Sequence, residues 1–349
     1  MTVTVGVIAN PASGRDIRRL VSSASVFDNA EKANMVVRLM TGLVAVGVDR
    51  VLMMPTAGSI LATLDRRLRA AAASGDRLPA FELLDMPFEE TAADTVRATS
   101  LLRTAGVRGI AVLGGDGTHQ LVARHCGDVP LLALSTGTNN AFPEMREATV
   151  AGMALGLAAT GQVATATACR RNSALAVRRG EDAWHGYALV DVAISADRFL
   201  GARAVWQPDE VLEIFVAFAE PSAIGLSAVA GLLRPTTRGA ELGVHVVLAP
   251  VDEAEVVITV PFAPGHVTPV GVRSFAPLRK GDEMPVEPGT GAIVLDGERD
   301  IERTAAERIT VRLVDGPLTI DVPKVLRYAA TNGLLRRALG ASFRGVPGS

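Results

Sequence analysis

The sequence predicts an α/β domain followed by a β-rich domain, and three observations support that prediction. Over roughly the first 160 residues, short runs rich in Val, Ile and Leu alternate with longer helix-like stretches. After about residue 162, strand-like runs follow one another with Pro- and Gly-rich turns between them. The 349 residues are 48% hydrophobic and 21% charged, enough apolar surface for two sizeable cores. We therefore expect α/β plus β, with an N-terminal doubly wound domain in residues 1–160 and a C-terminal β-sandwich in residues 161–323.

The apolar runs of the N-terminal half are continuous rather than alternating, as in parallel strands that are buried on both faces. Such strands are expected at residues 3–9, 50–54, 81–85, 109–113 and 130–134. Helices are expected between and after them, at residues 29–46, 59–73, 89–105, 118–125 and 147–160. Strands that alternate with helices in this way form a parallel sheet covered by helices on both faces.

The C-terminal half contains runs with the period of two that is typical of half-buried strands. Ile309, Val311 and Leu313 alternate with Thr310 and Arg312. Further strands are expected within residues 188–196, 242–249, 254–260 and 291–297. Several short strands separated by turns predict layered sheets.

Two other segments of the C-terminal half have a helical pattern. Between residues 208 and 233, two apolar stretches each have a proline near their start, which favours an inserted pair of helices that serve as core or as dimer contacts. From Pro323 the pattern again predicts a helix, and we expect residues 324–349 to pack back on the N-terminal domain. We also expect a homo-oligomer, most simply a dimer.

Charge and cysteine content narrow the classes of function. There are 35 Lys and Arg against 37 Asp and Glu, a net charge of −2, so we expect no nucleic-acid partner. Cys126 and Cys169 lie far apart, which argues against a disulfide framework or a structural zinc and favours a reducing cytoplasm. The N-terminus has no signal-peptide pattern, and no apolar run reaches the roughly 20 residues of a membrane span. We expect a cytoplasmic protein with no transmembrane segment.

Three polar, glycine-containing loops follow predicted strands of the N-terminal half. They read NPASGRD at residues 10–16, GGDGTHQ at 114–120 and STGTNNAFP at 135–143. Ligands of such sheets bind outside the carboxyl ends of the strands, and backbone N–H groups in glycine loops and at helix N-termini bind anions. Each loop alone can equally be an ordinary turn or a helix cap. Three of them at one edge of one sheet predict a shared phosphate site.

These motifs together resemble a known superfamily. GGDGT after a buried strand resembles the signature of the NAD kinase and diacylglycerol kinase-like superfamily. NPASGRD is similar to its first Asn-Pro/Ser-Gly loop, STGTNNAFP to its Gly-Thr-Gly-Asn loop, and LDGER at residues 295–299 to its Asp-Gly-Glu motif. Residues 27–55 further resemble the branch that contains ATP-NAD kinase-like proteins and acetoin catabolism protein X. The resemblance implies a Rossmann-like N-terminal domain, a C-terminal β-sandwich and an active site in the cleft between them.

Competing motifs do not occur in the sequence. There is no G-x-x-x-x-G-K-[ST], so the chain is not a P-loop NTPase. There is no G-x-G-x-x-G that opens the first helix, which weighs against a nicotinamide dehydrogenase. There is no G-x-S-x-G, which weighs against a nucleophile-elbow hydrolase.

Phosphoryl transfer from ATP to a hydroxyl group needs positioning and charge neutralisation more than covalent chemistry. Asp116 is the candidate catalytic residue, because a carboxylate there can orient the acceptor hydroxyl or accept its proton, and the resemblance implies the same role. The candidate nucleotide- and phosphate-binding residues are Asn10, Ser13, Gly14, Arg15, Gly114, Gly115, Gly117, Thr118, Thr136, Gly137, Thr138, Asn139 and Asn140. A small-molecule nucleotide, ATP with Mg²⁺, is the expected partner.

Candidate substrate-binding or supporting residues of the C-terminal half are Asp191, Asp296 and Glu298. Mg²⁺ would arrive with ATP, held by phosphates and by Asp296 or Glu298; the alternative for these two is a plain Asp-Gly hairpin turn. NAD is a possible acceptor. NAD kinases usually carry Asn before the acidic residue that matches Asp191, however, and this chain has Val190 there, so one polar contact to the dinucleotide is missing.

The histidines predict no metal site. His119 follows the middle loop directly and either faces the cleft or is a solvated, capped residue, and the other four lack ligand spacing. The sequence favours an ATP-dependent kinase that acts on a hydroxyl of NAD or a related small molecule. A lipid kinase of the same superfamily, with residues 211–233 facing the lipid, and a non-catalytic nucleotide-binding regulator linked to acetoin catabolism are the alternatives.

Overall fold

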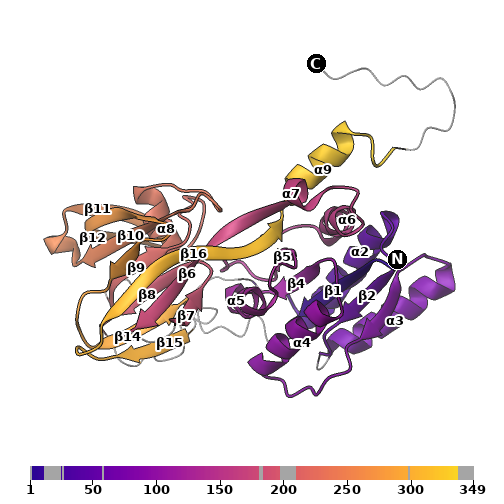
Figure 1. The fold of residues 1–349 in the computed structure, drawn as a ribbon, viewed down its shortest axis with the longest axis horizontal. Helices are drawn as coiled ribbons and strands as arrows, with labels where there is room; N and C mark the ends of the chain where they lie inside the picture. The colour runs from indigo at the N-terminus through magenta and orange to yellow at the C-terminus, as the bar shows by residue number, and fades with distance from the viewer. Residues whose placement is uncertain are drawn as a thin grey trace.

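The computed structural model describes residues 2–11, 25, 27–56, 59–180, 184–196, 210–297 and 299–336. Two bodies lie along the long axis, one built of strands and helices from the N-terminal half and one built mainly of strands from the C-terminal half (Figure 1). Four residues of the predicted site, Ser13, Gly14, Arg15 and Glu298, lie outside the described residues.

Five parallel strands form the centre of the N-terminal body, in the order β3-β2-β1-β4-β5. The strands are β1 Thr4–Ala9, β2 Arg50–Met53, β3 Ala80–Leu83, β4 Ile110–Gly114 and β5 Leu131–Ser135. The helices are α2 Asn29–Ala45, α3 Ser59–Ser74, α4 Ala92–Thr104, α5 Asp116–His125 and α6 Ala148–Ala159. Residues of α2, α3 and α6 share one apolar core with the sheet, and residues of α4 and α5 share another. Helices therefore cover both faces of the sheet, which confirms the doubly wound fold class.

The same sheet continues into the C-terminal body. β16 pairs with β5 at one end and with β6 along most of its length, and β7 and β13 extend this part of the sheet. These strands are β6 Cys169–Arg179, β7 Trp184–Ala188, β13 Glu283–Pro285 and β16 Ile309–Ile320. Figure 1 shows β6 and β16 as long strands that run from one body into the other. The two bodies are thus joined by backbone hydrogen bonds as well as by the chain.

A second, antiparallel sheet completes the C-terminal body, in the order β11-β12-β10-β9-β8-β14-β15. Its strands are β8 Asp191–Ser195, β9 Val211–Val216, β10 Leu242–Ala249, β11 Val256–Ala263, β12 His266–Arg279, β14 Gly291–Leu295 and β15 Arg299–Arg303, and a 3-10 turn, η3 Val251–Glu253, precedes β11. Leu175 of β6, Val311 of β16, Phe215 of β9 and Ile293 of β14 meet in one core between the sheets. A sheet-rich C-terminal domain follows the α/β domain, as the sequence predicted.

The predicted pair of helices between residues 208 and 233 is wrong in its first member. Residues 211–216 form β9, which lies between β8 and β10 inside the sheet. Ile214, Phe215 and Val216 are fully buried. A short, continuously apolar run suits a buried strand as well as a buried helix, and here pairing on both sides favours the strand. The second member is a helix, α8 Leu226–Leu233, whose buried residues pack on the same sheet.

The chain returns to the N-terminal body at its C-terminal end. α9 Val322–Thr331 contacts α6 and the short α7 Thr165–Ala168. Val325 and Ala329 of α9 are fully buried in the core that α2 and α6 share. Residues 337–349 lie outside the described residues. Within the described parts of the chain, no helix has the length and apolar character needed to cross a membrane.

Candidate functional site

The order of the parallel strands places two of the predicted loops side by side. β1 and β4 are neighbours, while β2 and β3 extend the sheet to one side and β5 to the other. Such a reversal of strand order opens a crevice at the carboxyl ends of the strands. β1 ends at Ala9, directly before Asn10, and β4 ends at Gly114, directly before the Gly115-Asp116 step. The first and second loops therefore begin at this crevice.

Side chains join the first two loops directly. Asn10 Nδ2 donates a hydrogen bond of 2.9 Å to Thr118 Oγ1 in the first turn of α5. Lys32 Nζ in turn donates to the backbone oxygen of Asn10 at 3.1 Å and to Asn29 Oδ1 at 3.3 Å. Lys32 is 1% exposed. A lysine is rarely buried to this extent unless its ammonium group has partners. Sequence reasoning missed this residue, although lysine is uncommon in the chain.

The two glycines of GGDGT allow close packing inside the protein. A Cβ atom on Gly114 would lie 2.8 Å from Thr118 Cβ, and one on Gly115 would lie 2.9 Å from Asn140 Oδ1. The space above these glycines is thus filled by the motif's own threonine and by the third loop. Glycine at these two positions therefore allows the loops to pack closely together. The sequence had suggested only that these glycines bind phosphate.

Asp116 ties α5 to the third loop. It is the first residue of α5, and its side chain is largely buried. Its Oδ2 accepts from the backbone N–H of Ala141 at 2.9 Å, and its Oδ1 accepts from that of Phe142 at 2.8 Å. The partial positive charge of a helix N-terminus also stabilises a carboxylate at this position.

The third loop is held from inside by Asn140. Its Nδ2 donates to Ser135 Oγ at 2.7 Å and to the backbone oxygen of Gly137 at 3.2 Å. The backbone N–H of Thr136 donates to the oxygen of Gly114, and that of Thr138 to the oxygen of Ser25. Of the two asparagines predicted to bind a ligand, Asn140 is therefore used within the loop.

Arg238 holds the same loop from the C-terminal body. Its guanidinium donates to the backbone oxygens of Ala141 and Phe142 and pairs with Glu220. It also stacks over the rings of Phe142 and Phe218. Asp116 thus binds the amide side of this loop and Arg238 its carbonyl side. Nothing in the local sequence around Arg238 marks this contact.

Asp296 makes a comparable contact in the C-terminal body. Its Oδ1 accepts from the backbone N–H groups of Val190 and Asp191, at 2.7 and 3.2 Å, and its Oδ2 from that of Leu189 at 2.9 Å. Asp296 and Gly297 both have positive φ, 50° and 69°, in the turn between β14 and β15. The Asp-Gly hairpin turn is therefore present, and its aspartate also fixes the start of β8.

Electrostatics couple the carboxylates of the site. Burial raises the pKa of Asp296 well above its usual range, and the neighbouring negative charge of Asp191 raises it further. The hydrogen bonds from Leu189 and Val190 oppose that rise, and the charge of Asp116 adds to it. Asp296 therefore keeps a proton to a higher pH than an exposed aspartate does.

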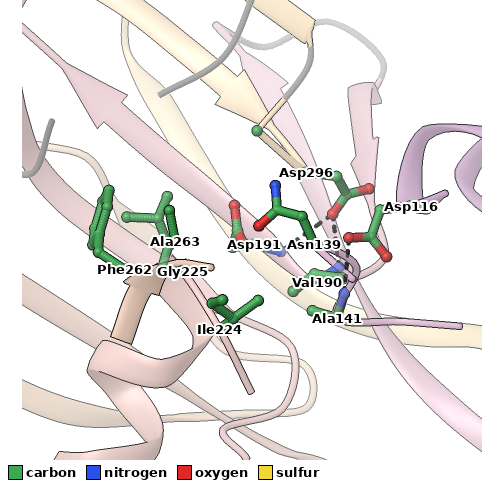
Figure 2. A pocket seen from close by; sticks show the side chains of 12 residues that line it. Asp116, Asn139, Ala141, Val190, Asp191, Ile224, Gly225, Phe262, Ala263 and Asp296 are labelled. Carbon is green, nitrogen blue, oxygen red and sulfur yellow. Dashed lines mark hydrogen bonds between the residues drawn. The ribbon is translucent and has the colours of Figure 1, made fainter. Parts of the chain in front are cut away.

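One pocket brings the two bodies together at these residues. Its empty volume of about 540 Å³ includes space that is open to solvent. The lining residues are Asp116, Asn139, Ala141, Val190, Asp191, Ile224, Gly225, Leu226, Phe262, Ala263, Asp296 and Gly297. Figure 2 shows Asp116 and Asp296 at one end, Ile224 and Phe262 at the other, and Asp191 and Asn139 between them. Asn139 Nδ2 is buried with no hydrogen-bond partner among the described residues, so a donor is available at this point.

Several predicted residues support the loops and do not line the pocket. These are Asn10, Gly114, Gly115, Gly117, Thr118, Thr136, Gly137, Thr138 and Asn140. His119 is neither cleft-facing nor solvated: it is fully buried beside Phe142, its Nδ1 lies 2.8 Å from the oxygen of Gly115, and burial lowers its pKa to about 4. In the described part of the chain, no group of three or more His, Cys, Asp or Glu is arranged to hold a metal ion.

Comparisons with known proteins agree with the two-part architecture. Residues 5–162 match the ATP-NAD kinase N-terminal domain, and residues 173–316 match the acetoin catabolism protein X C-terminal domain. The chain is 44% identical over 336 residues to acetoin catabolism protein X of Cupriavidus necator, covering 95% of this chain and 94% of that protein.

Proposed function

This chain belongs to the family of acetoin catabolism protein X and has an NAD kinase-like N-terminal domain, and from that premise we propose that it is an ATP-dependent kinase that phosphorylates a hydroxyl group of a small molecule. One observation carries the proposal: Asp116 of the glycine loop shares a pocket with Asp191 and Asp296 of the other body. A catalytic carboxylate must lie close to both the phosphate donor and the acceptor, and a pocket lined by both bodies allows this.

We assign the donor nucleotide to the part of the pocket that is lined by Asp116, the first residue of α5, and by Asn139. The first N–H groups of a helix have no partner within the helix and attract phosphate oxygens. The buried Nδ2 of Asn139, which has no partner among the described residues, supplies a further donor at the pocket. These groups fit the oxygen atoms of a nucleotide.

Mg²⁺ fits the same end of the pocket, because aspartate oxygens are ligands that it accepts. In the described residues the protein does not build a complete metal centre, so Asp296 or Asp191 would share the ion with phosphate oxygens. The bound ion would neutralise charge on the transferring phosphoryl group.

The acceptor hydroxyl is assigned to Asp116. Each of its oxygens accepts one backbone N–H, and the residue lines the pocket. Asp116 would orient the hydroxyl towards the donor phosphate and take its proton as the new P–O bond forms. The two backbone N–H groups fix the carboxylate in one orientation, which favours catalysis by positioning.

The lipid-kinase alternative loses its main support. It relied on an apolar helical surface at residues 211–233, but Val211–Val216 is a strand inside a sheet and α8 packs on that sheet. A non-catalytic regulator that binds nucleotide is left as the competing hypothesis.

The test is product analysis after incubation of the purified protein with Mg-ATP and a panel of alcohols that includes NAD. We expect ADP and one phosphorylated product. Millimolar Mg-ATP should also raise the melting temperature through binding to the native state. A rise in melting temperature without ADP formation on any acceptor would favour the regulator, and no rise with ATP, ADP, NAD or NADP would contradict the nucleotide site itself.

A further inference from the structure

Arg238 is separated from Asp116 by a single peptide group. Its Nη2 donates to the backbone oxygen of Ala141, and the N–H of the same peptide group, that of Phe142, donates to Asp116 Oδ1 at 2.8 Å. A guanidinium, one peptide unit and a carboxyl group therefore form one chain of hydrogen bonds. Asp116 lies at the start of α5 and lines the pocket, whereas Arg238 belongs to the C-terminal body and does not line it.

A peptide group can transmit an effect from one of these side chains to the other. Its C=O and N–H belong to one conjugated system, so a cation that donates to the oxygen also makes the N–H a stronger donor. Hydrogen bonds that follow one another in such a chain strengthen each other, and those with an ionised partner are the stronger kind. Arg238 supplies the charged donor at one end of the chain, and Asp116 is the acceptor at the other.

The guanidinium of Arg238 is itself held in one orientation. Nε and Nη2 donate to the two carboxylate oxygens of Glu220 at 3.0 and 3.2 Å, and Nη1 donates to the oxygen of Phe142. Together with the bond to Ala141, these contacts use four of its five N–H groups. The guanidinium also lies 4.5 Å from the centre of the Phe218 ring, and the side chain is 9% exposed. A lysine ammonium cannot reproduce this planar fork.

From this geometry we propose that Arg238 is a positioning residue of the site, which fixes the orientation of the Asp116 carboxyl group through the peptide group between Ala141 and Phe142. The inference rests on the proposed function only in giving Asp116 the role of base. The group that orients the base comes from the body opposite to the one that carries the base. The pocket therefore depends on both bodies for its chemistry as well as for its walls.

One NMR signal of the full-length protein reports on both ends of this chain. The dipeptide Ala-Phe occurs at residues 80–81, 141–142 and 217–218 only, so labelling with carbonyl-¹³C alanine and ¹⁵N phenylalanine leaves a correlation for each of these three peptide groups. The one that disappears in Phe142→Tyr belongs to residues 141–142. Its carbonyl ¹³C shift reports on the bond from Arg238, and its amide ¹H shift reports on the bond to Asp116. The 80–81 signal, from β3 outside the pocket, is the internal reference.

Arg238→Lys keeps the positive charge and removes the planar fork. We expect the Phe142 amide proton to move upfield together with the Ala141 carbonyl carbon, because both bonds of the chain weaken. Turnover with Mg-ATP should fall about tenfold or more, since a misplaced catalytic group loses the benefit of orientation, with little change in KM for ATP. Asp116→Asn tests the chain from its other end and should move the same two shifts, so the test does not depend on the folding of Arg238→Lys.

Arg97→Lys is the matched control. Arg97 also donates to a backbone oxygen, that of Pro87, and pairs with a buried carboxylate, that of Asp94, but none of the three lines the pocket. We expect this variant to change neither the 141–142 signal nor turnover.

A Phe142 amide proton that does not move in Arg238→Lys overturns the proposal, whatever happens to turnover. An equal movement of that proton in Arg97→Lys overturns it as well. Failure of the kinase function has a different signature: the wild type forms no ADP with any acceptor, while the 141–142 signal still depends on Arg238.

Discussion

Asp116 at the start of α5 and Asp296 in the turn after β14 each accept hydrogen bonds from successive backbone N–H groups. The first holds a loop, residues 141–142, and the second holds the start of a strand, residues 189–191. Asp116 lies at a helix N-terminus, which stabilises its negative charge. Asp296 lies in a turn with positive φ, and its pKa is raised by burial and by neighbouring negative charge.

The difference between these two contacts separates their chemical roles. Titratable groups in contrasting environments are suited to opposite tasks in proton transfer. Asp296 keeps a proton to a higher pH than an exposed aspartate does, and Asp116 is the carboxylate that we propose accepts one. The two bodies therefore contribute differently to the pocket, even though their backbone contacts look alike.

The largest expected effect comes from Asp116→Asn, which removes the carboxylate that we propose acts as the base. Turnover should fall by about 10²–10⁴-fold, because the amide has the size of the carboxylate but cannot act as a base. Stability should also fall by about 1–3 kcal/mol, since an NH₂ group must face the N–H of Ala141 or Phe142. An aspartate that only capped the helix would tolerate this change. A measured loss of stability therefore tests the contacts of Asp116 with Ala141 and Phe142. Steady-state kinetics and chemical unfolding measure the two effects.

Asp94→Asn is the matched control for that variant. Asp94 is a buried carboxylate, 2% exposed, which also accepts from two backbone N–H groups, those of Glu89 and Thr91. It lies at the start of α4, outside the pocket. A similar loss of stability with unchanged turnover is expected. If both variants lose turnover in proportion to stability, Asp116 has only a structural role.

Arg238→Met tests whether the loop held by Asp116 depends on both bodies. The change leaves the oxygens of Ala141 and Phe142 without the guanidinium and leaves Glu220 without its pair. Removing one partner of a buried ion pair costs about 3–5 kcal/mol. We expect a loss near the lower figure, because Glu220 is partly exposed. Arg273→Met, at an exposed pair of 3.8 Å with Glu253, should cost no more than about 1 kcal/mol, and equal losses for both would contradict the role given to Arg238.

Local patterns predicted one part of this site and could not predict the other. Asp116 and Asp296 follow apolar strands and precede glycine, so strand ends and turn residues identified both positions. Arg238 is 96 residues from Phe142 in the sequence, and no periodicity connects the two. The burial of Lys32 likewise depends on how α2 packs beside β1. The strand β9 was mistaken for a helix because its two neighbours, β8 and β10, decide its conformation.

The smallest expected effect is a pH dependence of stability that belongs to Asp296. An unfolded aspartate has a pKa of about 3.9, and the folded pKa of Asp296 is raised above that value. Between the two pKa values the folded protein binds a proton that the unfolded chain does not, so lowering the pH through this window favours the folded state. Asp296→Asn removes this titration and leaves the other carboxylates in place.

The free energy of unfolding of the wild type should therefore improve relative to Asp296→Asn as the pH falls through the raised pKa of Asp296 towards the unfolded value of about 3.9. The variant itself carries a constant penalty, since its amide faces the N–H groups of Leu189 and Val190. Urea unfolding of both proteins at each pH gives the difference directly, and effects common to both cancel. A difference that stays flat over this range, or one that moves against the wild type on acidification, would mean that burial and the charge of Asp191 do not act on Asp296 as the structure indicates.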